Sequence, residues 1–339
     1  MNIVPNPLTI NGLLSIPNEQ FVIPSYQRRY AWKEPQVWAL FEDIDMLQDG
    51  DGHLFGMLIL HSSKPHHAGI NQLDLVDGQQ RLTTLSLLLL AILKKYKEEE
   101  NEEKIADINK MLYCKDYNDK TFQKLILGDL DNDDFKRILK NNYAEIQNKN
   151  LLNAFNNFSI WIDKKTEDYG IIWLNKFFYK LVNVAKIIRL DVSHAQDAYK
   201  LFETINNRGL KLSATDIIKN FILGHAAKIS ESKLDEVKTI WSDIIISLDG
   251  LNTDDFFRQY ITGLYQRKIT HTKLVEEFKN YYFKNVDKVE LLGVFKYIEI
   301  QNDSLEEDEE DITEEFAIIE ETEENNRCRV QNHVNRLTR

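Results

Sequence analysis

The fold is decided by residues 76–90, VDGQQRLTTLSLLLL. An apolar strand ends at Val76, Asp77 and Gly78 turn the chain, and a long helix begins at Gln79. The middle of this helix is apolar on every side, which predicts that its first half lies in the core. Its first backbone N–H groups lack intrahelical partners and lie at the positive end of the helix dipole. The stretch therefore predicts a strand–turn–helix joint that can bind an anion such as phosphate.

The residues of this joint are candidates for the anion site. Gly78 would let the backbone approach a phosphate closely, and Gln79 and Gln80 add amide donors. Arg81 carries a planar guanidinium that suits bidentate phosphate contact. In the alternative interpretation, Asp77 caps the helix and Arg81 pairs with a carboxylate. The spacing alone leaves both interpretations open, because the joint is shorter than a Walker phosphate-binding loop.

Outward from the joint, the pattern predicts an α+β protein in which helices are in the majority. Strands are expected at residues 21–23, 54–60, 73–76 and 184–192. Helices are expected at residues 34–48, 79–100, 102–112, 133–140, 150–165, 171–182, 196–206 and 213–225, with more helix over 231–300. We expect a first domain over residues 1–225, with a helical insertion at about 101–182, and a helical region over 226–339.

A second polar segment, IPSYQRRYAW, spans residues 23–32 and places two arginines among three aromatic side chains. Tyr26 could stack on a base or on a guanidinium, and Gln27 with Arg28 could form a second wall of a phosphate pocket. In the alternative interpretation, the aromatic side chains lie in the core and the arginines lie at its rim. The segment alone is typical of the second arrangement.

A third polar segment, KLFETINNRGLKLSATDIIKNFIL, spans residues 200–223. Much of it is typical of one helix ending and another beginning with a capping box. Capping does not require Glu203, Asn206 and Arg208 at the helix end, and the first two lie on one helical face. A carboxylate there could hold Mg²⁺ or a ribose hydroxyl, and Lys219 could reach a phosphate. A packed joint between two helices is the structural alternative.

The formal net charge of −12 comes from one acidic segment. Residues 303–324 hold 13 acidic residues and no Lys or Arg, and the rest of the chain carries 41 acidic against 42 basic residues. Such a run repels itself and usually stays solvated, so we expect a linker or an exposed helix. The nearly neutral remainder neither indicates nor excludes a DNA-binding surface, which depends on local basic patches.

The remaining composition indicates a cytoplasmic protein. A chain of 339 residues that is 43% hydrophobic, with 13 Gly and 6 Pro, is neither collagen-like nor wholly disordered. Cys114 and Cys328 cannot build a disulfide framework or a Cys-based zinc site, which favours a reducing compartment. No stretch has the layout of a signal peptide or the length of a membrane span. The histidines show no metal-ligand spacing.

Taken in their order along the chain, the three polar segments resemble the N-terminal domain family of GmrSD-type restriction enzymes. These enzymes are type IV, modification-dependent DNA nucleases. The resemblance covers about residues 10–225 and is carried by FVIPSYQRRYAW, HLFGMLIL, LVDGQQRLTTL and LFETINNRGLKLSATDIIKN. It implies an N-terminal domain with a small mixed sheet, related to the ParB and sulfiredoxin nucleotide-binding domains. It also implies that the DGQQR segment binds and hydrolyses a nucleoside triphosphate and thereby licenses DNA cleavage.

The resemblance implies a nucleotide site around the DGQQR segment. The expected catalytic residues are Asp77, Gln80, Arg81 and Arg28, and Asp77 or Glu203 would bind Mg²⁺ or orient water. Positioning and charge neutralisation would then supply most of the catalysis, with the two arginines offsetting developing negative charge. The expected nucleotide-binding residues are Tyr26, Gln27, Arg28, Gly78, Gln79, Gln80, Arg81, Glu203, Asn206, Arg208 and Lys219.

The implied function is that of a sensor in an anti-phage restriction system. The expected partners are DNA, in the form of modified phage DNA, and a nuclease that acts in trans or was lost by truncation, since the sequence leaves no room for the family's nuclease domain. A homo-oligomer is compatible with this function, and no membrane partner is expected. The alternative is a ParB-like module that binds nucleotide or DNA without hydrolysis, and a scaffold without activity is a third interpretation.

Overall fold

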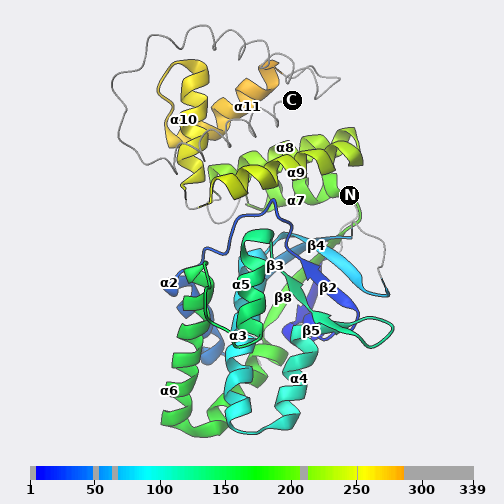
Figure 1. The fold of residues 1–339 in the computed structure, drawn as a ribbon, viewed down its shortest axis with the longest axis vertical. Helices are drawn as coiled ribbons and strands as arrows, with labels where there is room; N and C mark the ends of the chain where they lie inside the picture. Colours follow the sequence, from blue (N-terminus) through cyan, green and yellow to red (C-terminus); the bar gives the residue numbers. More distant parts are fainter. Residues whose placement is uncertain (1–4, 49–52, 63–67, 207–212, 250, 286–339) are drawn as a thin grey trace. The chain divides into compact units, whose positions relative to one another are not determined.

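The computed structural model describes residues 5–48, 53–62, 68–206, 213–249 and 251–285, with the side chains of all of these except residues 203–206 and 285. The chain divides into two compact units, unit 1 (Met1–Ala198) and unit 2 (Tyr199–Arg339). Unit 1 contains a mixed sheet with covering helices, and unit 2 is helical where it is described (Figure 1).

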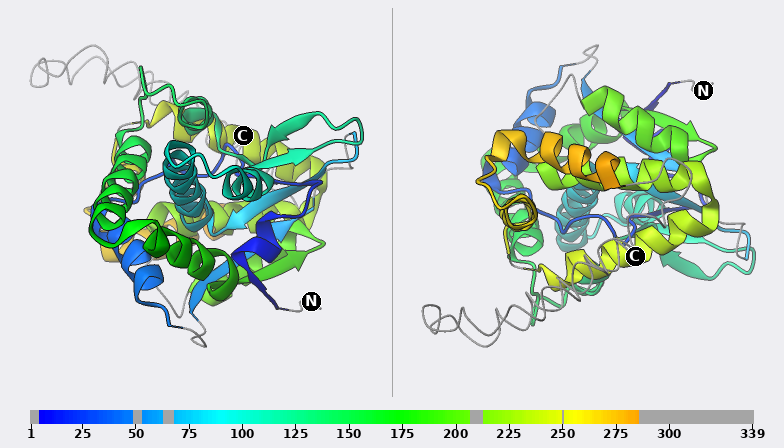
Figure 2. Two further views of the ribbon diagram at one scale, coloured as in Figure 1. Left: turned by 90° about the horizontal axis from the view of Figure 1, so that it is seen from below. Right: turned by 90° about the horizontal axis from the view of Figure 1, so that it is seen from above.

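The six-stranded sheet of unit 1 has the strand order β1-β8-β3-β4-β2-β7. Its strands are β1 (Asn6–Thr9), β2 (Glu19–Val22), β3 (Leu54–His61), β4 (Asn71–Asp77), β7 (Leu125–Ile126) and β8 (Lys186–Val192). Strand β2 runs parallel to both β4 and β7, whereas β3 is antiparallel to β4 and parallel to β8. A second, two-stranded sheet pairs β5 (Tyr113–Lys115) with β6 (Thr121–Gln123), and this hairpin projects from unit 1 (Figure 2).

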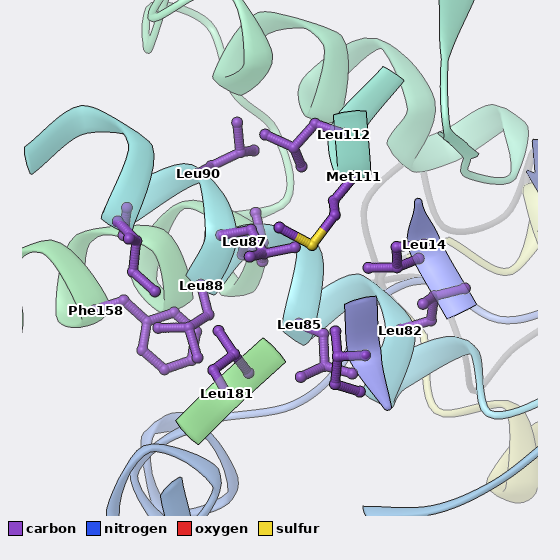
Figure 3. Packing of buried hydrophobic residues seen from close by; sticks show 14 of the residues in the cluster. Leu14, Leu82, Leu85, Leu87, Leu88, Leu90, Met111, Leu112, Phe158 and Leu181 are labelled. Atoms are coloured by element: carbon purple, nitrogen blue, oxygen red, sulfur yellow. The ribbon is translucent and has the colours of Figure 1, made fainter. Parts of the chain in front are cut away.

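The helices of unit 1 pack around α3. They are α1 (Ile10–Leu14), α2 (Glu34–Met46), α3 (Gln79–Glu98), α4 (Glu102–Leu112), α5 (Asp129–Leu139), α6 (Lys149–Tyr179) and the π-helical turn η1 (Lys180–Val184). Every residue of α3 from Leu82 to Leu93 is buried, as the apolar pattern predicts. Helix α3 packs against α4 and α6, and Figure 3 shows Leu87 and Leu88 of α3 between Met111 of α4 and Phe158 of α6.

The parallel strands place three following segments at one edge of the sheet. Strands β2, β4 and β7 run in the same direction, so their carboxyl ends meet at that edge. Strand β4 continues through Gly78 into α3, and β7 leads to Gly128 and α5. Residues 23–33, which we call the strap, follow β2. The topology thereby brings the second polar segment next to the predicted joint.

The described elements of unit 2 are helical. They are α8 (Ala214–Ile229), α9 (Glu231–Ser247), α10 (Thr253–Tyr265), the short 3₁₀ helix η2 (His271–Lys273) and α11 (Leu274–Asn285), and α7 (Ala195–Asn206) crosses the boundary between the units. Helix α8 packs against α9, α10 and α11. The Trp241 ring stacks on Phe257 with centroids 5.4 Å apart, which joins α9 to α10.

The predicted fold class, a helix-rich α+β protein, is confirmed. The four predicted strands are present as β2, β3, β4 and β8, whereas β1, α1 and the short strands β5 to β7 were not predicted. The compact units divide at residue 198, whereas the predicted first domain ends at residue 225, inside α8. The acidic segment 303–324 lies outside the described residues. Among the helices that are described, none has the length and apolar character needed to cross a bilayer.

Candidate functional site at the β4–α3 joint

The joint between β4 and α3 depends on a glycine. Gly78 is the N-cap of α3 and has φ +95°, in the left-handed region that favours glycine. A Cβ atom at this position would collide with the Leu58 side chain and lie 3.0 Å from the Met57 carbonyl oxygen. The sequence therefore needs glycine here both for the turn and for the close approach of the joint to β3.

Arg81 is held against β3. Its Nη1 donates to the Met57 carbonyl oxygen, and its Nη2 lies 3.7 Å from Asp77 Oδ2. Gly56 has φ +94°, and a Cβ there would lie 3.0 Å from Arg81 Nη1. The arginine side chain is 28% exposed, and its guanidinium has N–H donors beyond those two contacts. Gly56 was not among the predicted site residues, although an isolated glycine inside a strand pattern signals such a close approach.

Gln80 joins the strap to α3. Its Nε2 donates to the Arg29 carbonyl oxygen at 3.2 Å, and its Oε1 accepts from the Ala31 N–H at 2.8 Å. Both ends of the amide therefore bind main-chain groups of the strap. This geometry gives Gln80 a structural role, and its predicted contact with a nucleotide stays a prediction.

Two further side chains of the strap bind the β4–α3 region. Gln27 is buried, and its Nε2 donates to the Val76 carbonyl oxygen at 2.9 Å. Tyr30 shares a hydrogen bond of 2.8 Å with Thr84 on α3, and burial raises the pKa of its hydroxyl despite that bond. Tyr26 is buried as well. The tyrosines of this segment thus follow the alternative in which its aromatic side chains are part of the core.

On its other side the strap is held by the buried carboxylate of Asp131, in the first turn of α5. This carboxylate accepts from Arg29 Nε at 2.8 Å, from the Tyr30 N–H at 2.6 Å and from Asn148 Nδ2 at 2.9 Å. Asn148 also donates to the Tyr30 carbonyl oxygen at 3.0 Å. Sequence reasoning missed both residues, because they lie more than 100 positions after the strap residues that they bind and nothing local signals this contact.

The remaining predicted residues of unit 1 are Arg28 and Gln79. Arg28 is exposed on the strap, directly after the buried Gln27. Gln79 is the first residue of α3, and its Oε1 atom is buried without a hydrogen-bond partner among the described residues. The structure therefore brings Gln27, Arg28 and the DGQQR residues to one edge of the sheet.

The predicted residues of unit 2 are described only in part. Lys219 is buried, and its Nζ lies 3.5 Å from Asp216 Oδ1 on the same helix. The side chains of Glu203 and Asn206, and the whole of Arg208, lie outside the described residues. Their predicted nucleotide contacts stay predictions.

The N-terminus of α8 is capped by protein groups. Ser213 Oγ accepts from the Asp216 N–H at 3.0 Å, so Ser213 is the N-cap of α8 at the position where the capping-box spacing was predicted. The Asp254 carboxylate accepts from the Ala214 N–H at 3.2 Å and from the Thr215 N–H at 2.8 Å. The anion-binding groups at this helix end are therefore already satisfied by a carboxylate.

Asp77 and Glu203 are the two residues predicted to bind Mg²⁺. Within the described ranges, no three or more His, Cys, Asp or Glu side chains are grouped as a metal ion requires. Asp77 offers one carboxylate beside the N-terminus of α3, near Arg81. One carboxylate together with substrate phosphate oxygens is a common way to bind Mg²⁺, so Asp77 fits as a single ligand. The other predicted ligand, Glu203, is not described at the side-chain level.

Comparison with known proteins gives one family. The chain matches none of the curated proteins with which it was compared. The family model for the GmrSD restriction endonuclease N-terminal domain matches residues 10–223, which include the strap, the β4–α3 joint and most of α8. This match covers more than half of the chain and confirms the resemblance drawn from the polar segments. The chain therefore belongs to the GmrSD restriction endonuclease N-terminal domain family and is a component of a restriction system.

Proposed function

We propose that the protein binds a nucleoside triphosphate at the β4–α3 joint and hydrolyses it with Mg²⁺. In this proposal it is the sensor part of a modification-dependent restriction system that acts on modified phage DNA, with a nuclease in trans. One observation carries the proposal: the N-terminus of α3 has no side-chain cap, and Arg81 is oriented beside it.

The other helix ends of the protein support this reading of α3. The first turn of α3 holds no acidic residue, and its N-cap, Gly78, has no side chain to accept from the backbone. The first turn of α8 is covered by the Asp254 carboxylate, and α5 carries Asp129 and Asp131 in its first turn. Because helix N-termini favour negative charge, an anion such as a phosphate would supply at α3 what carboxylates supply at the other two helices.

The proposed roles follow from exposure and contacts. Arg81 and Arg28 would bind phosphate oxygens and offset the negative charge that develops during hydrolysis. Asp77 would hold Mg²⁺, which neutralises phosphate charge when bound. The buried Oε1 of Gln79 would accept a hydrogen bond from a ligand hydroxyl or from water. Gln27 and Gln80 would act by holding the strap that carries Arg28.

The remaining parts of the proposal rest on the family. We include a relation to the ParB and sulfiredoxin nucleotide-binding domains, and a nucleotide contribution from Glu203, Asn206, Arg208 and Lys219. A cytoplasmic location and a homo-oligomer fit a restriction component that meets phage DNA inside the cell.

The test is phosphate release from the four ribonucleoside triphosphates with Mg²⁺, together with thermal shifts induced by each nucleotide. Arg28→Gln should lower release about tenfold or more, because a hydrogen bond from a charged donor contributes about 1.5–3 kcal/mol. Its melting temperature without nucleotide is measured alongside, so that a lost ligand contact is distinguished from a loss of stability. Lys97→Gln, an exposed lysine near the other end of α3, is the matched control. Equal release by Arg28→Gln and this control would refute the assignment.

One observation favours the alternative, a module that binds nucleotide or DNA without turnover. Both ends of the Gln80 amide are engaged by the strap, so this side chain is not placed to orient an attacking water. Nucleotide-induced stabilisation without phosphate release would support the binding module. Binding of DNA through the same arginines would then weaken steeply with rising salt.

A further inference from the structure

A cleft in unit 1 lies away from the β4–α3 joint. It has a volume of about 340 Å³ and lies between α1, α4, the end of α6 and η1. Its wall residue Asn175 accepts a hydrogen bond of 2.8 Å from the Tyr96 hydroxyl, near the C-terminal end of α3. Gln79 and Tyr96 are separated by about 25 Å along the helix axis, given a rise of about 1.5 Å per residue. The cleft is therefore distinct from the proposed nucleotide site.

The cleft has an apolar floor and a polar rim. Met111, Phe178 and Val182 are buried and form the floor. The rim carries the amides of Asn11, Asn175 and Asn183, the hydroxyls of Ser15 and Tyr179, and the charged residues Lys104, Lys110 and Asp107. The volume and this mixture of surfaces are typical of sites for small molecules.

Two of the three rim asparagines already use their amide oxygens as acceptors within the protein. Asn175 Oδ1 accepts from Tyr96, and Asn11 Oδ1 accepts from the Ser15 hydroxyl at 2.5 Å. The amide nitrogens of these asparagines are left to donate to a ligand. A ligand that offers hydrogen-bond acceptors therefore fits this rim.

The charge at the cleft is positive. The Asp107 carboxylate accepts from Lys110 Nζ at 3.0 Å, which balances those two charges. Lys104 is partly buried with its Nζ 5.8 Å from the centroid of the Phe178 ring, and it has no carboxylate partner in the part of the chain that is described. One ammonium group thus faces the cleft without a compensating carboxylate. An anion would compensate this charge.

We propose that this cleft binds a small phosphate monoester, with its phosphate on Lys104 and its polar body on the asparagine amides. A nucleoside monophosphate and a sugar phosphate share this chemistry. The π-helical turn η1 contributes Val182 and Asn183 to the cleft, and such turns occur frequently at functional sites. The site does not depend on the proposed hydrolysis of a triphosphate.

The test is calorimetric titration of the full chain with adenosine 5′-monophosphate, glucose 6-phosphate, inorganic phosphate and adenosine. We expect at least one of the two esters to bind, with adenosine much weaker, and the stronger ester identifies the source. Lys104→Gln should weaken that binding roughly tenfold or more, and Lys136→Gln, an exposed lysine outside the cleft, should leave it unchanged. Asn183→Ala gives a second variant on the exposed rim and should weaken binding severalfold.

Binding at the cleft is distinguished from binding at the joint by Arg28→Gln. This variant should leave the titration with the monoester unchanged even if it abolishes triphosphate hydrolysis. Absence of binding by both esters at millimolar concentration, or full binding by both Lys104→Gln and Asn183→Ala, would overturn the proposal.

Discussion

The Gly78→Ala substitution tests the close packing of the β4–α3 joint on β3. The added methyl group would be placed on a backbone with φ +95° and would point at β3. It would collide with the Leu58 side chain and lie 3.0 Å from the Met57 carbonyl oxygen. The second contact involves backbone, so it cannot be relieved by rotation of a side chain.

The expected loss of stability has two contributions. A left-handed backbone costs an alanine about 1–2 kcal/mol. Overpacking in a well-packed region costs about 1–3 kcal/mol more. The free energy of unfolding should therefore fall by about 2–5 kcal/mol in Gly78→Ala, a large share of the roughly 5–15 kcal/mol typical of native proteins.

Gly170→Ala is the matched control, because Gly170 has φ +73° in α6 and no atom within 4 Å of an added Cβ. Its ψ of 175° lies in a region essentially restricted to glycine, so it should lose a backbone contribution of about 1–3 kcal/mol and no packing contribution. The assay is urea unfolding followed by tryptophan fluorescence, since four of the five tryptophans lie in unit 1. If Gly78→Ala loses no more stability than Gly170→Ala, the packing argument is wrong.

Two further predictions concern the strap and unit 2. Asp131→Asn leaves one acceptor oxygen for the two donors Arg29 Nε and the Tyr30 N–H. The free energy of unfolding should therefore fall by about 2–4 kcal/mol, and proteolytic cleavage in the strap should become faster. Unchanged cleavage in limited proteolysis would contradict this. His225 shares a 2.9 Å hydrogen bond with Tyr282, and burial lowers the pKa of His225 in the folded protein. Below about pH 6.5 the unfolded state therefore binds more protons than the folded state, so unit 2 should lose stability as the pH falls. The measurement is hydrogen exchange of α8 at neutral and at mildly acidic pH. Lowering the pH should reduce the protection of α8 less in His225→Phe than in the wild type, and an equal reduction in both would contradict the role given to His225.

The sequence predicted the central helix and strands because each of them is marked by residues close together in the chain. The apolar run after Gly78 identifies a buried helix, and the alternation and turn residues identify the strands before it. The break in α6 was also predicted, since separate helices were expected at 150–165 and 171–182 and Gly170 has a non-helical conformation between them. The two-residue strand β7 was missed, because it is too short to show any periodicity.

The contacts of the candidate site were less accessible to sequence reasoning. The sequence predicts that Gln80 donates to a phosphate, whereas its partners are main-chain groups 49 and 51 positions away. The carboxylate that holds the strap, Asp131, lies about 100 positions from it. Such pairings depend on which strands are parallel and adjacent, and one sequence does not determine that order.

The polar residues of the two motifs differ in how much of each side chain is used to hold the edge of the sheet and how much stays exposed. Gln27 and Gln80 direct their amides to main-chain groups, whereas Arg28 is exposed and Arg81 remains 28% exposed beside a helix N-terminus. Both kinds stand next to each other in the sequence, so residue type alone cannot separate them. Replacing Gln80 should lower stability together with any activity, whereas replacing the exposed Arg28 should lower ligand binding more than it lowers stability. Comparing Gln80→Ala with Arg28→Gln therefore tests whether DGQQR is itself a binding loop or chiefly the frame that positions the binding arginines.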